Sequence, residues 1–259
     1  MTKLALVRPP SPRLAEGLVT HISRSPIDAA LAQRQWVGYV AALQANGWAT
    51  TEVAAAPECP DSAFIEDTVV VFRNVAVLAR PGADARKPEV AAAAQAVERF
   101  GYRTVEIHAP GTLDGGDVLK VGDTIYVGNG GRTNAEGIAQ LAAAFQPLGA
   151  TVVTVPLSKV LHLKSAVTAL PDGTIIGWPA AVDDVSLFPN FLAVPEESGS
   201  HVVILDDHTL LLSSDCPQSA SLLRGRGYDL VLVDIGEFIK LEGCVTCLSV
   251  RLREAPRGS

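Results

Sequence analysis

Short apolar runs rich in Val, Ile and Leu recur along the chain and alternate with stretches whose apolar positions repeat at helical spacing. Apolar, β-branched runs bounded by Gly, Pro, Asn or Asp predict strands, and apolar positions three or four residues apart predict helices. In the N-terminal part this pattern predicts a strand at 3–8, a helix at 27–45 and a strand at 48–53. Asn46 and Gly47 end that helix.

From residue 69 onward the predicted elements recur in one order: two strands, a helix and a strand. The predicted elements are strands at 69–72 and 75–79, a helix at 88–100 and a strand at 104–107; strands at 117–121 and 124–127, a helix at 134–145 and a strand at 151–155; strands at 165–170, 174–178 and 191–194; and strands at 202–205 and 209–212, a helix at 218–226 and a strand at 230–235. No clear helix is predicted between 178 and 191. Units start at 69, 117, 165, 202 and 247, so their spacings are 48, 48, 37 and 45 residues. Such a quasi-period is typical of a repeat architecture.

The fifth unit has only one strand at the C-terminal end, predicted at 247–252, and the N-terminal strand, helix and strand supply the rest. Joining the two ends closes a ring, which removes exposed sheet edges. The sequence therefore predicts an α/β fold, a five-bladed α/β propeller of ββαβ units with pseudo-fivefold symmetry. A mixed α/β sandwich is the alternative. We expect residues 1–259 to form one domain, with the Pro- and Gly-bearing segment 9–26 as a lid loop.

Composition and charge argue against a membrane protein and against a nucleic-acid-binding protein. At 48% hydrophobic, 259 residues can bury a large core. No segment approaches the ~18–20 apolar residues of a membrane span, and residues 1–10 lack a signal-peptide core. We therefore expect no membrane association and a cytoplasmic location. A net charge of −7 without a Lys and Arg cluster argues against nucleic-acid binding.

Four cysteines raise the question of disulfides or zinc: Cys59, Cys216, Cys244 and Cys247. If Cys244 and Cys247 lie on a strand, their Cα atoms are about 10 Å apart, beyond the ~7 Å that a disulfide tolerates. The Cys-x-x-Cys pair also lacks a second pair of ligands at zinc-finger spacing. The sequence therefore favours free thiols and no structural metal, as in a reducing compartment.

Polar residues stand just before the first strand of several units. They are Asp61, Glu66 and Asp67 before 69, Asp114 before 117, His162 before 165, and Cys247 at the fifth start. Taken singly, each has a structural explanation: a satisfied histidine, a buried cysteine, a turn aspartate or a solvated acid. Equivalent positions in a ring point toward one axis, so their shared place favours a site in which a thiol nucleophile works with an imidazole and an acid.

Two arginines extend this candidate site. Arg86 lies in a loop at 82–87, and Arg132 precedes Asn134, which with Thr133 is a candidate helix cap. Solvent exposure is their alternative role. Arginine holds a carboxylate in bidentate fashion, and acids hold a guanidinium. The set therefore suits a zwitterionic small-molecule substrate that also carries a cation.

At these residues the chain resembles the dimethylarginine dimethylaminohydrolases, within the guanidino-modifying superfamily of amidinotransferases and arginine deiminases. The resemblance rests on PDSAFIED at 60–67, ARPGA at 79–83, GGDV at 115–118, GRTNAEG at 131–137, VLHLKS at 160–165 and GCVTCLS at 243–249. These motifs cover nearly the whole chain in the expected order. The five-module propeller of that family agrees with the repeat.

The resemblance implies a role for each candidate residue. Cys247, not Cys244, would be the nucleophile, His162 the general acid and base, and Asp114 its support. The substrate-binding groups would be Glu66 and Asp67 for the guanidinium, Asp61 and the carbonyl of Leu18 for the α-amino group, Arg86 and Arg132 for the α-carboxylate, and the carbonyl of Leu241 near the substituted nitrogens. The implied substrate is a methylated arginine, with no metal or organic cofactor, and a homodimer is left open.

Two other functions remain as alternatives. One is an arginine or other guanidine deiminase, or an amidinotransferase; these relatives usually carry insertions, whereas five units use all 259 residues here. The other is a non-catalytic propeller that binds a partner, which would have no Cys, His and acid set at the mouth of the ring.

Overall fold

The computed structural model describes residues 3–253; residues 1, 2 and 254–259 of the predicted domain lie outside the described part. The strands are β1 (Lys3–Val7), β2 (Trp48–Glu52), β3 (Val69–Phe72), β4 (Val75–Leu78), β5 (Arg103–Glu106), β6 (Val118–Val121), β7 (Thr124–Asn129), β8 (Thr151–Pro156), β9 (Val167–Ala169), β10 (Ile175–Gly177), β11 (Phe191–Ala193), β12 (Val202–Ile204), β13 (Thr209–Ser213), β14 (Asp229–Val233) and β15 (Val250–Leu252). The α-helices are α1 (Ala29–Ala45), α2 (Val90–Arg99), α3 (Ala135–Phe145), α4 (Leu163–Ala166), α5 (Pro217–Gly225) and α6 (Gly236–Ile239).

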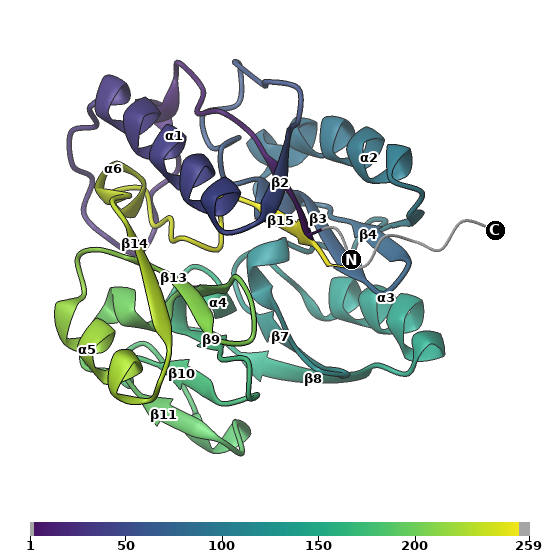
Figure 1. Cartoon of the computed structure of the whole chain (residues 1–259). Coiled ribbons are helices and arrows are strands. Elements are labelled where there is room, and N and C mark those ends of the chain that lie inside the picture. Colours follow the sequence, from purple (N-terminus) through teal and green to yellow (C-terminus); the bar gives the residue numbers. More distant parts are fainter. Residues whose placement is uncertain (1–2, 254–259) are drawn as a thin grey trace.

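Residues 3–253 form five three-stranded sheets that share one pairing pattern. Each sheet combines an antiparallel pair with a parallel pair, as in the antiparallel β3 and β4 and the parallel β4 and β5. A parallel pair needs a crossover connection. In the described chain α1, α2, α3 and α5 supply it in four units, which lie around a common centre in Figure 1. The predicted ββαβ repeat is confirmed.

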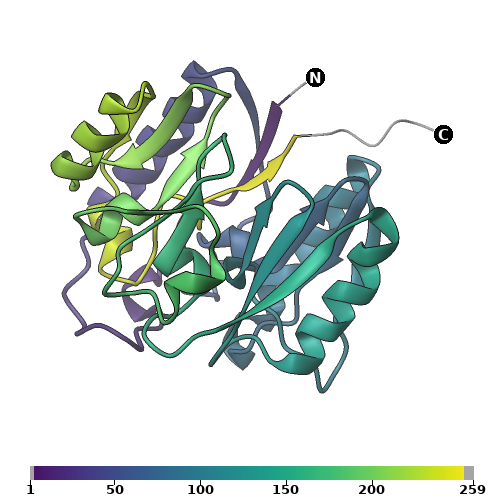
Figure 2. The same ribbon diagram turned by 90° about the horizontal axis from the view of Figure 1, so that it is seen from below.

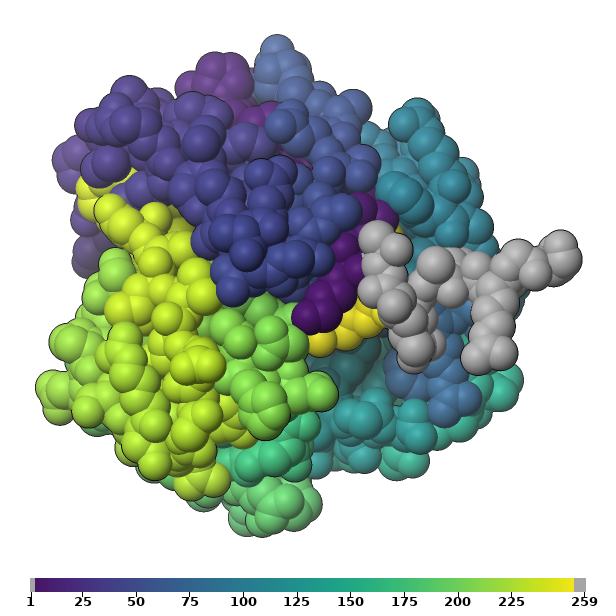
Figure 3. Space-filling view, viewed as in Figure 1, coloured from purple at the N-terminus to yellow at the C-terminus, as the bar shows by residue number. Residues whose placement is uncertain are grey.

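The two ends of the chain close the ring. β1 lies between β15 and β2: it pairs antiparallel with β15, with Leu4 opposite Leu252, and parallel with β2. Figures 1 and 2 show the purple β1 beside the yellow β15, and Figure 3 shows both colours meeting at the surface. The predicted closure is confirmed. Within residues 3–253 the five sheets stay separate, so the ring is closed by packing between sheets.

Buried clusters shared between neighbouring units hold the sheets together. β3 is buried on both faces, which explains its unbroken apolar sequence. Its side chains alternate between two cores: Val70 packs with residues of β6, β7 and α3, and Val71 packs with α2 and β15. None of the helices in residues 3–253 combines the length and apolar character needed to cross a membrane.

The structure departs from the predicted elements in two places near the candidate site. The strand predicted at 165–170 begins at Val167, because Leu163–Ala166 forms the helical turn α4. The strand predicted at 247–252 is wrong in its first half, since Cys247 lies in a turn and β15 begins at Val250. Between β10 and β11 the chain forms only the short 3-10 helix Val185–Leu187, where no clear helix was predicted.

Candidate active site

The loops that precede the first strands of several units meet at a cavity of about 20 Å³. Among the predicted site residues, those that line it are Leu18, Asp61, Asp67, Arg86, Arg132, His162, Leu241 and Cys247. Asp114 does not line the cavity but contacts His162. Glu66 belongs to a different cavity. The repeat therefore brings the thiol, the imidazole and Asp67 to one place, as their positions in the sequence suggested.

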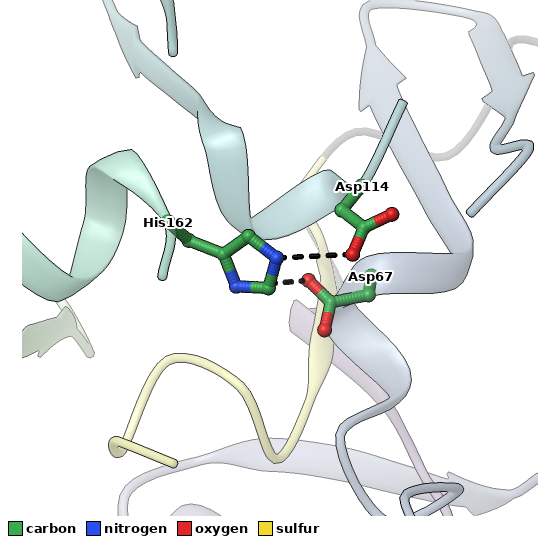
Figure 4. A group of neighbouring side chains, drawn as sticks. All are labelled: Asp67, Asp114 and His162. Carbon is green, nitrogen blue, oxygen red and sulfur yellow. Dashed lines mark hydrogen bonds and ion pairs between the residues drawn. The ribbon is translucent and has the colours of Figure 1, made fainter. Parts of the chain in front are cut away.

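His162 lies between two carboxylates that come from the loops before β3 and β6 (Figure 4). Its Nε2 is 3.0 Å from Oδ2 of Asp114, and its Nδ1 is 3.9 Å from Oδ1 of Asp67. Asp114 is fully buried, and its Oδ1 accepts a hydrogen bond from the Gly82 N–H at 2.9 Å. This fixed carboxylate sets the direction of the imidazole ring, and a role for Asp114 in catalysis stays a prediction.

Gly116 leaves the space that this packing requires. A Cβ at this position would lie 2.6 Å from Nδ1 of His162 and 2.7 Å from Oδ1 of Asp67. The Gly116 N–H also donates to that Asp67 oxygen at 2.7 Å. A glycine before β6 is therefore needed because the imidazole and the carboxylate approach its backbone closely.

The charges around His162 favour its protonated form. Burial lowers the pKa of His162, but the nearby carboxylates of Asp67, Asp117 and Asp114 outweigh this effect and raise the pKa to about 9. Burial, with a smaller contribution from the Asp114 charge, outweighs the opposing effect of His162 and raises the pKa of Asp117 to about 6. At neutral pH His162 is therefore an imidazolium that can donate a proton into the cavity.

Arg86 is buried and forms an ion pair with Asp67. Its Nη1 lies 2.6 Å from Oδ2 of Asp67, and its Nη2 lies 2.8 Å from Oε2 of Glu89. Its Nε also donates to Oε1 of Glu89 at 3.2 Å, and its Nη2 donates to the carbonyls of Asp61 and Phe64. Burial raises the pKa of Asp67, but His162 and Arg86 together hold it well below its usual range. In this structure, therefore, Arg86 points its N–H groups at protein acceptors, and Asp67 is an anion.

Asp67, Asp114 and His162 also form a group whose ligand atoms lie within 4.8 Å of one another, a spacing that suits a metal ion. Each carboxylate oxygen of the two aspartates already has a protein partner. For Asp67 these partners include Gly116 and Arg86, and for Asp114 they include Gly82 and His162. The group is thus satisfied by protein contacts, and the metal-free site expected from the sequence stays a prediction.

Arg132 and Asp61 occupy two other sides of the cavity. Arg132 lies 3.5 Å from Oδ2 of Asp114 through its Nη1, a longer contact than that of Arg86 with Asp67. Asp61 accepts hydrogen bonds from the Leu18 N–H at 3.1 and 3.2 Å. Burial raises the pKa of Asp61, although Arg86 opposes that change. Both residues therefore present charged groups to a ligand that enters the cavity.

Glu66 faces away from the small cavity. Its Oε1 is 2.6 Å from Nζ of Lys164 and 2.9 Å from Nη2 of Arg251, and its Oε2 is buried without a hydrogen-bond partner in the described residues. It lines a larger cavity of about 680 Å³, which Lys164 and Arg251 also line. The structure thus separates Glu66 from Asp67, and a role for Glu66 in holding a guanidinium stays a prediction.

The segment 9–26, which the sequence predicted to be a lid loop, reaches the small cavity through Leu18. Besides the contact of Leu18 with Asp61, the backbone N–H groups of Thr20 and His21 donate to the two carboxylate oxygens of Glu242, at 2.8 and 2.5 Å. Glu242 has a positive φ of 62°. Segment 9–26 is therefore held to the stretch that also carries Leu241 and the two cysteines, and its role as a lid stays a prediction.

Cys244 and Cys247 lie much closer together than the sequence predicted. The segment between them is a turn, closed by a hydrogen bond from the Cys247 N–H to the Cys244 carbonyl at 3.1 Å. The two sulfur atoms are 3.3 Å apart. The expected Cα separation of about 10 Å assumed a strand, and that assumption is wrong here.

The two sulfurs have different surroundings. Cys247 lines the small cavity, whereas the Cys244 sulfur contacts the Thr246 hydroxyl at 3.2 Å. The hydrogen bond between the thiols lowers the pKa of Cys244 to about 5 and raises that of Cys247 well above its usual range, because the pair shares one proton. Gly243 is explained by packing: a Cβ there would collide with the ring of Phe64.

Several residues of the site were not predicted from the sequence. Phe64, Leu161 and Glu242 line the small cavity, and Glu89 completes the ion pairs of Arg86. Glu242 is next to the predicted Leu241, and Glu89 is three residues after Arg86 at the start of a helix. The sequence held no signal for their partners, because these contacts join segments far apart in the chain or depend on side-chain direction.

Comparison with known proteins places these features in a family. No protein-family model matches the chain. The N(G),N(G)-dimethylarginine dimethylaminohydrolase of Streptomyces coelicolor is 65% identical over 253 residues, which cover 98% of this chain and 98% of that protein. The protein of the same name from Pseudomonas aeruginosa is 34% identical over 254 residues, covering 97% of this chain and 100% of that protein.

Solved structures give the same result. A cysteine-to-serine mutant of the P. aeruginosa dimethylarginine dimethylaminohydrolase complexed with citrulline has a TM-score of 0.90 and 31% identity, with coverage of 97% of this chain and 100% of that chain. A histidine-to-glycine dimethylarginine dimethylaminohydrolase in an adduct with S-methyl-L-thiocitrulline has a TM-score of 0.91, with the same identity and coverage. By sequence along nearly its whole length and by fold, the chain belongs to the dimethylarginine dimethylaminohydrolase family.

Proposed function

We propose that this protein hydrolyses N-omega-methylated arginines, namely asymmetric dimethylarginine and monomethylarginine, to citrulline and dimethylamine or methylamine. The names of the two relatives from S. coelicolor and P. aeruginosa support this reaction, and so does the citrulline in the P. aeruginosa structure. The observation that carries the proposal is the meeting of Cys247, His162 and Asp67 at one buried cavity. That set supplies a nucleophile, a proton donor and an anion for the substrate cation.

The first half of the proposed reaction forms a covalent intermediate. The Cys247 thiolate attacks the guanidinium carbon, so a C–S bond forms and the carbon becomes tetrahedral. His162, held as an imidazolium by its carboxylate neighbours, donates its proton to the methylated nitrogen. The C–N bond then breaks, dimethylamine leaves, and an S-alkylthiouronium remains on Cys247.

The second half releases the product. Neutral His162 now takes a proton from a water molecule, and the resulting hydroxide attacks the alkylthiouronium carbon. The C–S bond breaks, the electron pair returns to Cys247 as a thiolate, the added hydroxyl group loses its proton to solvent, and citrulline leaves. Asp114 keeps its hydrogen bond to Nε2 in both steps, so the ring holds one orientation while its proton leaves and returns.

Ionisation of Cys247 follows from substrate binding in this scheme. In the ligand-free structure the hydrogen bond between the thiols favours the negative charge on Cys244. A guanidinium cation beside Cys247 stabilises a thiolate there, so the proton of this thiol is released when the substrate binds. The Asp67 carboxylate attracts the same cation. The substrate guanidinium therefore both binds to Asp67 and helps to activate the nucleophile.

Substrate entry requires the lid to open and the arginines to move. A cavity of about 20 Å³ holds about one water molecule, far less than an amino acid needs. We infer that Arg86 leaves Asp67 to the substrate guanidinium and, with Arg132, turns toward the α-carboxylate. The carbonyl of Leu18 and the Asp61 carboxylate are then free for the α-amino group, and the Leu241 carbonyl lies near the substituted nitrogens.

A comparison of substrates tests the proposal. Purified protein is incubated with asymmetric dimethylarginine or with arginine, and citrulline, dimethylamine and ammonia are measured. We expect kcat/KM for dimethylarginine to exceed that for arginine by about tenfold or more, since one methyl group in an apolar contact changes transition-state binding by about 1–3 kcal/mol. A preference for arginine, with release of ammonia, would support the deiminase alternative instead.

Several other properties of the protein remain predictions from the sequence. They are a single catalytic domain over residues 1–259, independence from metal and cofactor, a cytoplasmic location, no nucleic-acid or membrane partner, and the question of a homodimer. Gel filtration with light scattering at several concentrations decides the last of these.

A further inference from the structure

The contact between Cys244 and Cys247 goes beyond what the hydrolysis requires. One thiol suffices as the nucleophile, yet a second buried thiol lies 3.3 Å from it. Neither sulfur is bonded to another, since all four cysteines are free. We propose that Cys244 and Cys247 form a site of reversible oxidation, in which a disulfide across the turn at 244–247 switches off the nucleophile. The loss of activity, though not the disulfide itself, rests on the function proposed above.

The backbone already has the geometry of a short disulfide loop. The N–H of Cys247 donates to the carbonyl of Cys244 at 3.1 Å, which defines a four-residue turn. The ends of such a turn have Cα atoms less than about 7 Å apart, within the range that disulfides span. The sulfurs need to approach from 3.3 Å to about 2.05 Å, a distance that side-chain rotation can supply.

The surroundings favour reaction at this pair over the other cysteines. Cys247 lines the small cavity, so a small oxidant that enters the substrate site reaches its sulfur. The hydrogen bond between the thiols lowers the pKa of Cys244, so the pair carries a thiolate at neutral pH. Burial raises the pKa of Cys216 to about 12, and its thiol donates to the Ser213 carbonyl, so that residue stays protonated and unreactive.

The oxidant is a hydroperoxide, with hydrogen peroxide as the simplest member. Transfer of the Cys247 proton to the Cys244 thiolate across the 3.3 Å contact leaves a thiolate on Cys247, which faces the cavity. This thiolate attacks an oxygen of hydrogen peroxide: an S–O bond forms, the O–O bond breaks, and hydroxide leaves and takes up a proton. The Cys244 sulfur then attacks the sulfenic sulfur: an S–S bond forms, the S–O bond breaks, and a second water leaves. Two thiols and one peroxide give one disulfide and two waters. A dithiol reverses the step by exchange.

Such a pair protects the nucleophile as well as inhibiting it. A lone sulfenic acid is oxidised further to sulfinic acid, which a dithiol does not reduce. The neighbouring Cys244 captures the sulfenic acid before that step. The predicted mark of the site is therefore full recovery of activity after reduction, and its loss when Cys244 is replaced.

Peptide mass and activity test the proposal together. The reduced protein is treated with a small molar excess of hydrogen peroxide, its free thiols are alkylated, and it is digested with trypsin without reduction. Cleavage after Lys240 and Arg251 releases one peptide that carries Cys244 and Cys247 without Cys59 or Cys216. We expect this peptide to be unalkylated and lighter by two hydrogens than its reduced form.

Activity on dimethylarginine should fall at least about tenfold with the disulfide and return after dithiothreitol, because the thiolate is the nucleophile. Cys244→Ser should lose activity in peroxide without recovery and carry sulfinic acid on Cys247. Cys216→Ser, the matched control, should behave as the parent protein. Two alkylated cysteines in the parent peptide, or equal recovery by Cys244→Ser, would overturn the proposal. If the reduced parent shows no activity, the proposed function fails, while the peptide mass still decides on the disulfide.

Discussion

His162 holds its proton because three acidic side chains surround a buried imidazole. Its Nε2 lies 3.0 Å from Asp114, and its Nδ1 lies 3.9 Å from Asp67. Asp117 adds a third nearby carboxylate, which is fixed by hydrogen bonds from the Thr133 hydroxyl and the Leu163 N–H. In the proposed reaction, the raised pKa of His162 keeps this general acid protonated at neutral pH. The rate should fall at alkaline pH, where His162 loses its proton.

The sign of this effect gives a pH prediction. His162 is protonated below its pKa of about 9 and loses its proton as the pH rises through that value, so kcat should fall on the alkaline side. Asp114→Asn removes one carboxylate that raises the pKa. The alkaline fall of kcat should therefore move to lower pH by roughly one unit, in addition to any loss of maximal rate.

The measurement is kcat against pH for the parent and the variant. Asp123→Asn is the matched control, because Asp123 is exposed, pairs with Arg73 and does not line the small cavity. If Asp114→Asn lowers kcat at every pH and leaves the alkaline fall in place, Asp114 acts on orientation alone.

Sequence position predicted which residues meet, but not the side-chain contacts among them. Equivalent places in the repeat brought Asp67, His162 and Cys247 together. The β-branched run around Val245 and Thr246 was typical of a strand, and only the hydrogen bond between Cys247 and Cys244 shows a turn. The ion pairs of Glu66 with Lys164 and Arg251 could not be predicted from the sequence either, because they join residues from distant parts of the chain.

Hydrogen bonds from its backbone hold the predicted lid segment, residues 9–26, to the rest of the protein. The sequence predicted no helix or strand in this segment. Its backbone N–H groups at Leu18, Thr20 and His21 nevertheless donate hydrogen bonds to the carboxylates of Asp61 and Glu242. We propose that this segment closes over the substrate and excludes water.

Glu242→Gln tests the fastening of the lid. The amide keeps the size of the side chain but loses its charge, and hydrogen bonds to charged groups are worth more than neutral ones. We expect KM for dimethylarginine to rise about fivefold, which corresponds to about 1 kcal/mol, with a smaller change in kcat. Glu136→Gln, at an exposed position in the first turn of α3, is the control and should leave KM unchanged. An unchanged KM in Glu242→Gln would show that these contacts do not hold the lid.

Most elements of the repeat could be predicted because their burial is strong. β3 matches its prediction residue for residue, since all four of its side chains are buried. Predictions were weaker where an element is short. α4 is a single helical turn whose sequence continues directly into β9, so periodicity could not separate the two. The short 3-10 helix Val185–Leu187 is likewise too brief to show a period.

The whole molecule depends on β15, which joins the last unit to the first. Leu252 faces Leu4 across β15 and β1, and it is buried in the core that also contains Val69 and Val71. The quasi-period predicted this closure, because the fifth unit was incomplete without the N-terminal strand. Whether the five sheets would merge or stay separate could not be predicted, since that depends on the packing between units.

Leu252→Ala should weaken the closure. Removing a buried leucine leaves a cavity and destabilises a protein by about 2–5 kcal/mol. We expect a loss of this size in the free energy of unfolding, measured by urea denaturation. Val37→Ala, at a position on α1 that is 52% exposed, should change stability by less than about 0.5 kcal/mol. Equal stability of the two variants would mean that the strand does not close the ring in solution.

The proposed reaction depends on Cys247, and not Cys244, as the nucleophile. Citrulline formation by a variant of each cysteine tests this assignment most directly. Cys247 lines the cavity with His162, whereas Cys244 lies outside it. Both variants are assayed on dimethylarginine under reducing conditions. The account predicts that Cys247→Ser forms no detectable citrulline and that Cys244→Ser keeps most of the parent activity. Turnover by Cys247→Ser together with an inactive Cys244→Ser would contradict it.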